Sequence, residues 1–108
     1  MATREEIAAI FTRIIERFSP EKAADINATI QFELSGDGGG SYWLKIADGT
    51  IETGEGAVEN PRMTVRAADD DFVSMVTGGI APMQAFMLGK IKIQGDTNLA
   101  MKLIPLLG

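Results

Sequence analysis

The sequence predicts an α+β fold of two layers, in which a five-stranded, mostly antiparallel sheet carries helices on one face. Three observations support this: a helical apolar period near the N-terminus, a switch to alternation of period two at residue 28, and a return to a helical period in the last quarter. Nearly every expected strand keeps one polar face, so we expect helices on the other face only. With 108 residues there is room for one core, and we interpret residues 1–108 as a single domain.

The N-terminal segment has the pattern of an amphipathic helix. Thr3 and Glu6 have the spacing of a capping box. Ser19 and Pro20 are expected to end the helix and to begin a further short turn. The apolar residues that recur at three- and four-residue intervals are Ile7, Ile10, Phe11, Ile14, Ile15 and Phe18.

Four alternating runs then predict strands at residues 28–34, 41–47, 50–55 and 62–67. The glycine-rich segment 36–40 resembles a phosphate-binding loop, but Ser41 opens a strand rather than a helix, which favours a hairpin connection. Asp48-Gly49 predicts a tight turn. The inward-facing residues of three of these strands are Ile30, Phe32 and Leu34, then Tyr42, Leu44 and Ile46, then Met63, Val65 and Ala67.

Helices return after the fourth strand. Residues 69–71 are three aspartates, which we interpret as stabilising a helix N-terminus rather than as a metal or acid–base site. Pro82 can start a short helix with the apolar stripe Met83, Phe86 and Met87. A fifth strand with Ile91 and Ile93 facing inward follows.

The final helix is apolar almost all round. Asp96 is expected to cap it, and Pro105 to end or kink it. Such a helix must be covered by the protein's own core, by a partner protein or by an apolar ligand. The residue pattern alone leaves these three alternatives open.

Composition disfavours several function classes. The formal charge of −5 argues against nucleic-acid binding, which depends on clustered Lys and Arg. The chain has no His and no Cys, so it lacks an imidazole base and a thiolate nucleophile, and we expect neither enzymatic activity nor a bound metal or cofactor. The acidic start does not resemble an export signal, and we expect a cytoplasmic protein.

Residues 85–96, AFMLGKIKIQGD, continuing as Leu99-Ala100-Met101-Lys102-Leu103, are similar to the signature of the sterol carrier protein 2 family, the non-specific lipid-transfer proteins. Upstream, WLKI at residues 43–46, PRMTV at residues 61–65 and Asp71-Phe72 resemble the same family in the same order. The resemblance covers most of the chain and weakens before Ala28.

This resemblance implies an apolar tunnel between the sheet and the helices that takes up a fatty acyl chain, acyl-CoA or a sterol-like lipid. It implies a non-catalytic carrier, at most in transient contact with membranes, as a monomer or weak dimer. The alternative is an accessory module for a lipid- or quinone-modifying enzyme. The residues that the resemblance places in the tunnel wall are Phe32, Leu44, Met63, Val65, Phe72, Met75, Met83, Phe86, Met87, Leu99, Leu103 and Leu106.

Overall fold

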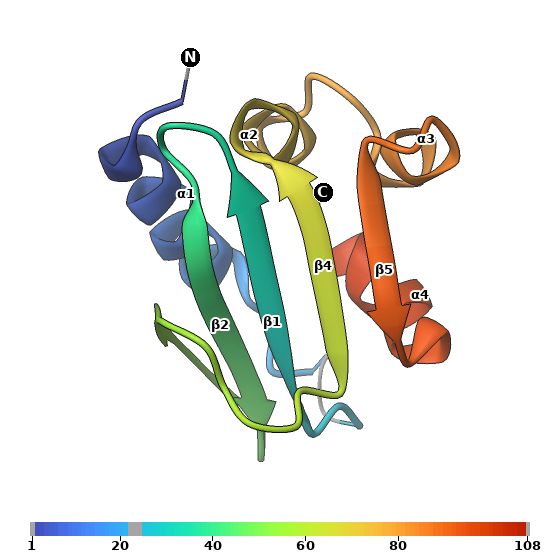
Figure 1. Cartoon of the computed structure of the whole chain (residues 1–108). Coiled ribbons are helices and arrows are strands. Elements are labelled where there is room, and N and C mark those ends of the chain that lie inside the picture. The colour runs from blue at the N-terminus through green and yellow to red at the C-terminus, as the bar shows by residue number, and fades with distance from the viewer. Residues whose placement is uncertain (1, 22–24, 108) are drawn as a thin grey trace.

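The computed structural model describes residues 2–21 and 25–107, with side chains as far as Leu103. The helices are α1 (Arg4–Arg17), α2 (Asp69–Thr77), α3 (Pro82–Met87) and α4 (Thr97–Leu107). The strands are β1 (Ala28–Ser35), β2 (Gly40–Ala47), β3 (Thr50–Glu55), β4 (Met63–Ala68) and β5 (Ile91–Gly95). Figure 1 shows α1, α2 and α4 behind the sheet and α3 beside the start of β5. Within the described residues, the α+β architecture with helices on one face is confirmed.

The five strands form one sheet in the order β3-β2-β1-β4-β5 across the described part of the chain. β1 pairs with β4 in parallel, while its pairing with β2, and the pairings of β2 with β3 and β4 with β5, are antiparallel. The register places Phe32 beside Tyr42 on one side and beside Val65 on the other. The inward-facing residues of neighbouring strands therefore form continuous rows beneath the helices.

The core fills the space between this face and the helices. Phe11 of α1 is its aromatic centre, with ring centroids 5.0 Å from Tyr42, 5.3 Å from Phe32 and 5.5 Å from Phe72. Separations in this range are favourable for aromatic pairs, which adds to the stabilisation from burial. These rings fasten α1 and α2 to the sheet at one end of the inner layer.

Local signals position the helices as expected. The Thr3 hydroxyl accepts a hydrogen bond from the Glu6 backbone N–H at 3.1 Å and caps α1. Asp48 and Gly49 both have positive φ, 52° and 76°, as a two-residue hairpin turn requires. α4 is continuous to Leu107, so the helix does not end at Pro105.

Asp69 does more than stabilise the start of α2. Its carboxylate is buried and accepts hydrogen bonds from the backbone N–H of Gly38, at 2.9 Å, and of Asp70, at 2.7 Å. Gly36 lies so close that a Cβ there would collide with the Asp69 carboxylate. The hairpin between β1 and β2 is thus fixed to α2, which positions the end of the sheet against the helical layer.

The burial of Gln31 corrects the expectation that the outward face of β1 is solvated. Only 4% of the Gln31 surface is exposed, because the segment after β3 covers it. Its amide donates to the carbonyls of Tyr42 and Gly56, each at 3.0 Å, and accepts from the Val58 N–H at 2.8 Å. The buried amide is therefore well satisfied by backbone partners.

Candidate functional site

Two small apolar cavities lie between the sheet and the helices. The first, of about 30 Å³, is lined by Ile14, Phe18, Ile30, Phe32, Leu44, Ile46, Ile51, Met63, Val65 and Leu103. The second, of about 20 Å³, is lined by Met63, Val65, Met75, Pro82, Ile91, Ile93, Ala100 and Leu103. Each of the five strands and each of the helices α1, α2, α3 and α4 contributes a side chain to at least one of the two linings.

Met63, Val65 and Leu103 line both cavities. Met63 and Val65 project from β4, which lies between β1 and β5, and Leu103 projects from α4. The three side chains are buried, with 3%, 4% and 6% of their surface exposed. They lie where the two linings meet, and we call these three residues the partition.

Neither cavity is an open tunnel. A void of about 30 Å³ has room for one or two water molecules, whereas pockets for small ligands measure about 300–1,000 Å³. The described side chains therefore pack as a nearly closed core. An acyl chain would enter this space only if the partition or α4 moved.

The structure separates the twelve predicted wall residues into groups. Phe72 and Leu99 are buried in the core without lining either cavity. The Leu106 side chain lies outside the described residues. The predicted residues that line one or both cavities are Phe32, Leu44, Met63, Val65, Met75 and Leu103. That these six contact a lipid stays a prediction.

Met83, Phe86 and Met87 do not face the interior in this structure, and their contact with a lipid stays a prediction. Their side chains are 38%, 45% and 79% exposed. Ala85, with no exposed surface, is the residue through which α3 contacts the core. Because alanine is small, α3 approaches closely along that side and turns its larger side chains outward. Pro82, not one of these three, is the α3 residue at the second cavity.

Sequence reasoning missed several lining residues that its own pattern identifies. Ile30 and Ile46 share the inward parity of Phe32 and Leu44, and Ile14 lies on the apolar stripe of α1. Ile91 and Ile93 face inward on β5. The strand and helix periods were sufficient to find them, and the resemblance drew attention to fewer positions.

Polar contacts hold the first half of α4 at its edges. Asp96 accepts a hydrogen bond from the Leu99 N–H at 3.1 Å and lies 3.4 Å from the Arg62 guanidinium. The Lys102 Nζ lies 3.2 Å from the Asp25 carboxylate and, through this hydrogen bond, lowers the pKa of Asp25. Both ion pairs are solvent-exposed and contribute little stability. The inner face of this half is purely aliphatic.

The described residues offer little for chemistry. No group of three or more His, Cys, Asp or Glu among them could hold a metal ion. None of their helices is both long enough and apolar enough to cross a lipid bilayer.

Known proteins are similar to this chain in sequence and in fold. The profile of the SCP-2 sterol transfer family matches residues 11–108. A mouse protein, "Hydroxysteroid dehydrogenase-like protein 2", is 38% identical over 94 residues; the match covers 86% of this chain but only 19% of the mouse protein. The chain thus spans about a fifth of that curated relative.

Solved structures agree in fold. The crystal structure of Sterol Carrier Protein 2 Like 2 from Aedes aegypti has a TM-score of 0.74 at 23% identity, over 94% of this chain and 96% of that one. The apo form of Sterol Carrier Protein 2 from Yarrowia lipolytica has a TM-score of 0.71 at 24% identity, over 91% and 86%. With the profile match over nearly the whole sequence, these findings show that the chain belongs to the SCP-2 sterol transfer family.

Proposed function

We propose that this chain binds a fatty acyl chain, acyl-CoA or sterol-like lipid between the inner face of the sheet and α4, without catalysing a reaction. Membership of the SCP-2 sterol transfer family implies lipid binding or transfer in general. The observation that carries the more specific proposal is the pair of small apolar cavities whose linings share Met63, Val65 and Leu103.

Binding requires the partition or α4 to move, and the inner face of α4 is held to the sheet by apolar contacts. The α4 residues that line the cavities are Ala100 and Leu103, whose side chains make no directional bonds with the sheet. An entering acyl chain replaces these apolar contacts with its own, and each methylene removed from water contributes about 0.8 kcal/mol. A wall of aliphatic side chains distinguishes ligands by only about 1–3 kcal/mol per methylene, so selectivity should be broad. We propose a cytoplasmic carrier that acts as a monomer or weak dimer.

The test is to identify and displace the bound lipid. Organic extracts of the purified protein are analysed by mass spectrometry, and a fluorescent fatty acid is titrated into delipidated protein. We expect near-stoichiometric lipid in the extract, saturable fluorescence and competition by unlabelled palmitate. An extract without lipid, together with no saturable fluorescence, would contradict the proposal.

A second candidate function is presentation of the lipid to an enzyme. The observation that favours it is coverage: this chain matches only 19% of a mouse protein whose name is hydroxysteroid dehydrogenase-like. If so, the purified chain should bind the part of the mouse protein that lies outside the matched segment, and it should bind more tightly when a steroid is present. Calorimetry of the two components with and without the steroid measures this. Absence of heat in both titrations would leave the carrier function alone.

A further inference from the structure

The α3 segment carries an unusual concentration of exposed apolar side chains. Met83, Phe86, Met87 and Leu88, hereafter the α3 patch, have 38%, 45%, 79% and 61% of their surface exposed. Of the five large apolar side chains that stand exposed among the described residues, four lie in this patch, and the fifth is Met101 of α4. Grouped exposure of this kind marks an interaction surface, whereas single exposed residues do not.

The outward orientation of the patch is fixed by the backbone. Ala85, fully buried, anchors the opposite side of α3. The Leu88 N–H donates to the Gln84 carbonyl at 2.9 Å, and the Lys90 N–H donates to the Ala85 carbonyl at 2.9 Å. Turning Phe86 or Met87 inward would break this anchored turn. The patch is therefore presented to its surroundings by a well-bonded segment.

The charge around the patch differs from that of the whole chain. The chain has a net charge of −5, yet residues 72–95 contain two lysines and no carboxylate. Lys90 and Lys92 follow the patch directly in sequence, and both are exposed. Lys92 pairs in register with Arg66 of β4. An apolar surface bordered by cations lies at one end of an otherwise acidic protein.

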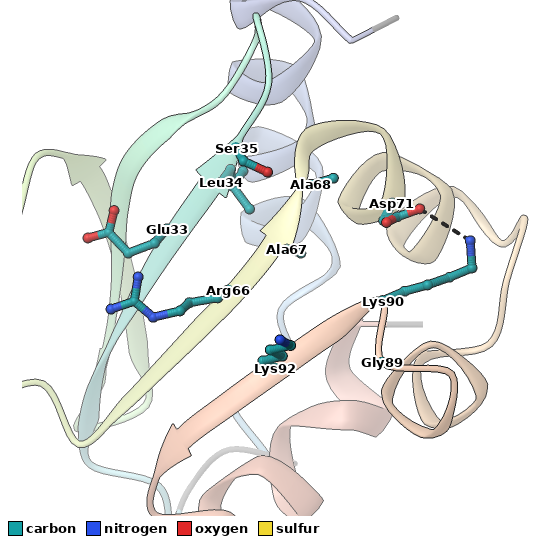
Figure 2. A pocket seen from close by; sticks show the side chains of 10 residues that line it. All are labelled: Glu33, Leu34, Ser35, Arg66, Ala67, Ala68, Asp71, Gly89, Lys90 and Lys92. Carbon is teal, nitrogen blue, oxygen red and sulfur yellow. Dashed lines mark ion pairs between the residues drawn. The ribbon is translucent and has the colours of Figure 1, made fainter.

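Figure 2 shows these cations around a depression on the sheet beside α3. The depression measures about 630 Å³, and its charged lining consists of Arg66, Lys90 and Lys92 against Glu33 and Asp71. Lys90 lies 3.5 Å from the Asp71 carboxylate, and Arg66 donates to Gln94 at 3.1 Å. Lys92 has no ion pair with a described carboxylate, which leaves its ammonium available for an external anion.

We propose that the α3 patch docks this protein on membranes that contain anionic phospholipid. The four apolar side chains would enter the outer part of the bilayer, while Lys90 and Lys92 would remain at the level of the phosphate groups. Each lysine near an anionic surface strengthens binding about fivefold. The net negative charge elsewhere repels such a membrane, which favours approach through the acid-free segment.

This docking proposal rests on the proposed function and specifies the edge of the cavity through which a lipid would pass. Pro82 of α3 lines the second cavity, and α3 contacts α4. An α3 patch seated in the bilayer would hold the α3–α4 edge of the cavity against the lipid. A lipid could then pass between membrane and interior without crossing bulk water.

The test measures flotation of the protein with vesicles of phosphatidylcholine, with and without phosphatidylglycerol. We expect stronger binding to the anionic vesicles, weakened by salt, since the screening length falls from about 10 Å at 0.1 M to about 3 Å at 1 M. Lys92→Gln should weaken anionic binding about fivefold, and Met87→Gln about tenfold. The matched controls are Lys45→Gln, at an exposed position of β2, and Met101→Gln, at an exposed position of α4. Both variants should bind vesicles as the unaltered protein does.

Several results would overturn the docking proposal. These are no flotation, equal binding to both vesicle types, or equal losses in patch and control variants. A change in sedimentation velocity with Met87→Gln, without a change in flotation, would assign the patch to protein contact instead. Titration of each variant with fluorescent fatty acid in vesicle-free solution separates the two proposals. Retained fatty-acid binding without flotation rejects docking alone, whereas absent fatty-acid binding in the unaltered protein rejects the proposed function.

Discussion

Truncating Leu103 to alanine provides a direct test of the partition between the two cavities. The side chain is 94% buried and lines both voids. Leu103→Ala removes three carbon groups, a transfer loss of about 2.4 kcal/mol. With the cavity left behind, the free energy of unfolding should fall by about 3–5 kcal/mol. Urea denaturation of lipid-free protein measures this loss.

Lipid binding should change in the opposite direction. On the proposed function, Leu103 moves away from Met63 and Val65 when an acyl chain passes from one cavity to the other. Alanine makes few of these contacts, so most of that opening cost disappears from the binding equilibrium. We expect palmitate to bind Leu103→Ala about tenfold more tightly, a difference of about 1.4 kcal/mol. Competition against the fluorescent fatty acid measures the change in Kd.

Leu99→Ala is the matched control. Leu99 has the same 6% exposure on the same helix but lines neither apolar cavity. Its truncation should cost about 2–5 kcal/mol of stability and change the palmitate Kd by less than about threefold. Weaker binding by Leu103→Ala, or equal changes in Kd for both variants, would refute the idea that Leu103 divides the ligand space.

Three further predictions concern stability. Asp69→Ala should lower the free energy of unfolding by about 1–3 kcal/mol, because it leaves the buried Gly38 N–H unpaired; no change in the urea midpoint would contradict this. Tyr42→Phe should leave stability equal or raise it by about 1 kcal/mol, because the buried hydroxyl has no hydrogen-bond partner among the described residues; a marked loss would show that the hydroxyl is bonded. Lys102 lowers the pKa of Asp25 in the folded state. This pair therefore stabilises the protein at pH values above the pKa of Asp25 in the unfolded chain, and the stabilisation is lost as the pH falls through the pKa of Asp25 in the folded protein. Thermal melts of Asp25→Asn should differ from those of the unaltered protein near neutral pH and converge with them in acid.

The strands were predictable because alternation of period two is a local signal that one buried face imposes on every residue. Hence the inward rows through Phe32, Leu44 and Val65 were confirmed. The parallel pairing of β1 with β4, and thus the strand order, was not predicted, because it joins segments separated by two other strands and leaves no local pattern. Gln31 shows the same limit: parity directs it outward, but a distant loop buries it.

The site was harder to predict than the fold. In α3, six residues form fewer than two turns, too few for periodicity to distinguish a buried face from an exposed one. Phe86 and Met87 have the composition of a core stripe, and only the close packing of Ala85 shows that the helix faces the other way. The cavity volumes depend on how side chains from nine elements interlock, which no single segment of the sequence specifies.

On the proposed function, the two ends of the inner layer differ in the cost of admitting a lipid. At the α1 end, Phe11 contacts the rings of Phe32, Tyr42 and Phe72 at centroid distances of 5.0–5.5 Å, and opening this end would separate several aromatic pairs. At the α4 end, the described wall is aliphatic, and Leu103 is the α4 residue that closes both cavities. Separating aliphatic surfaces breaks no directional interaction, and an entering acyl chain restores the apolar contacts that are lost. Entry at the α4 end therefore costs less, and this is the end beside which α3 exposes its apolar side chains.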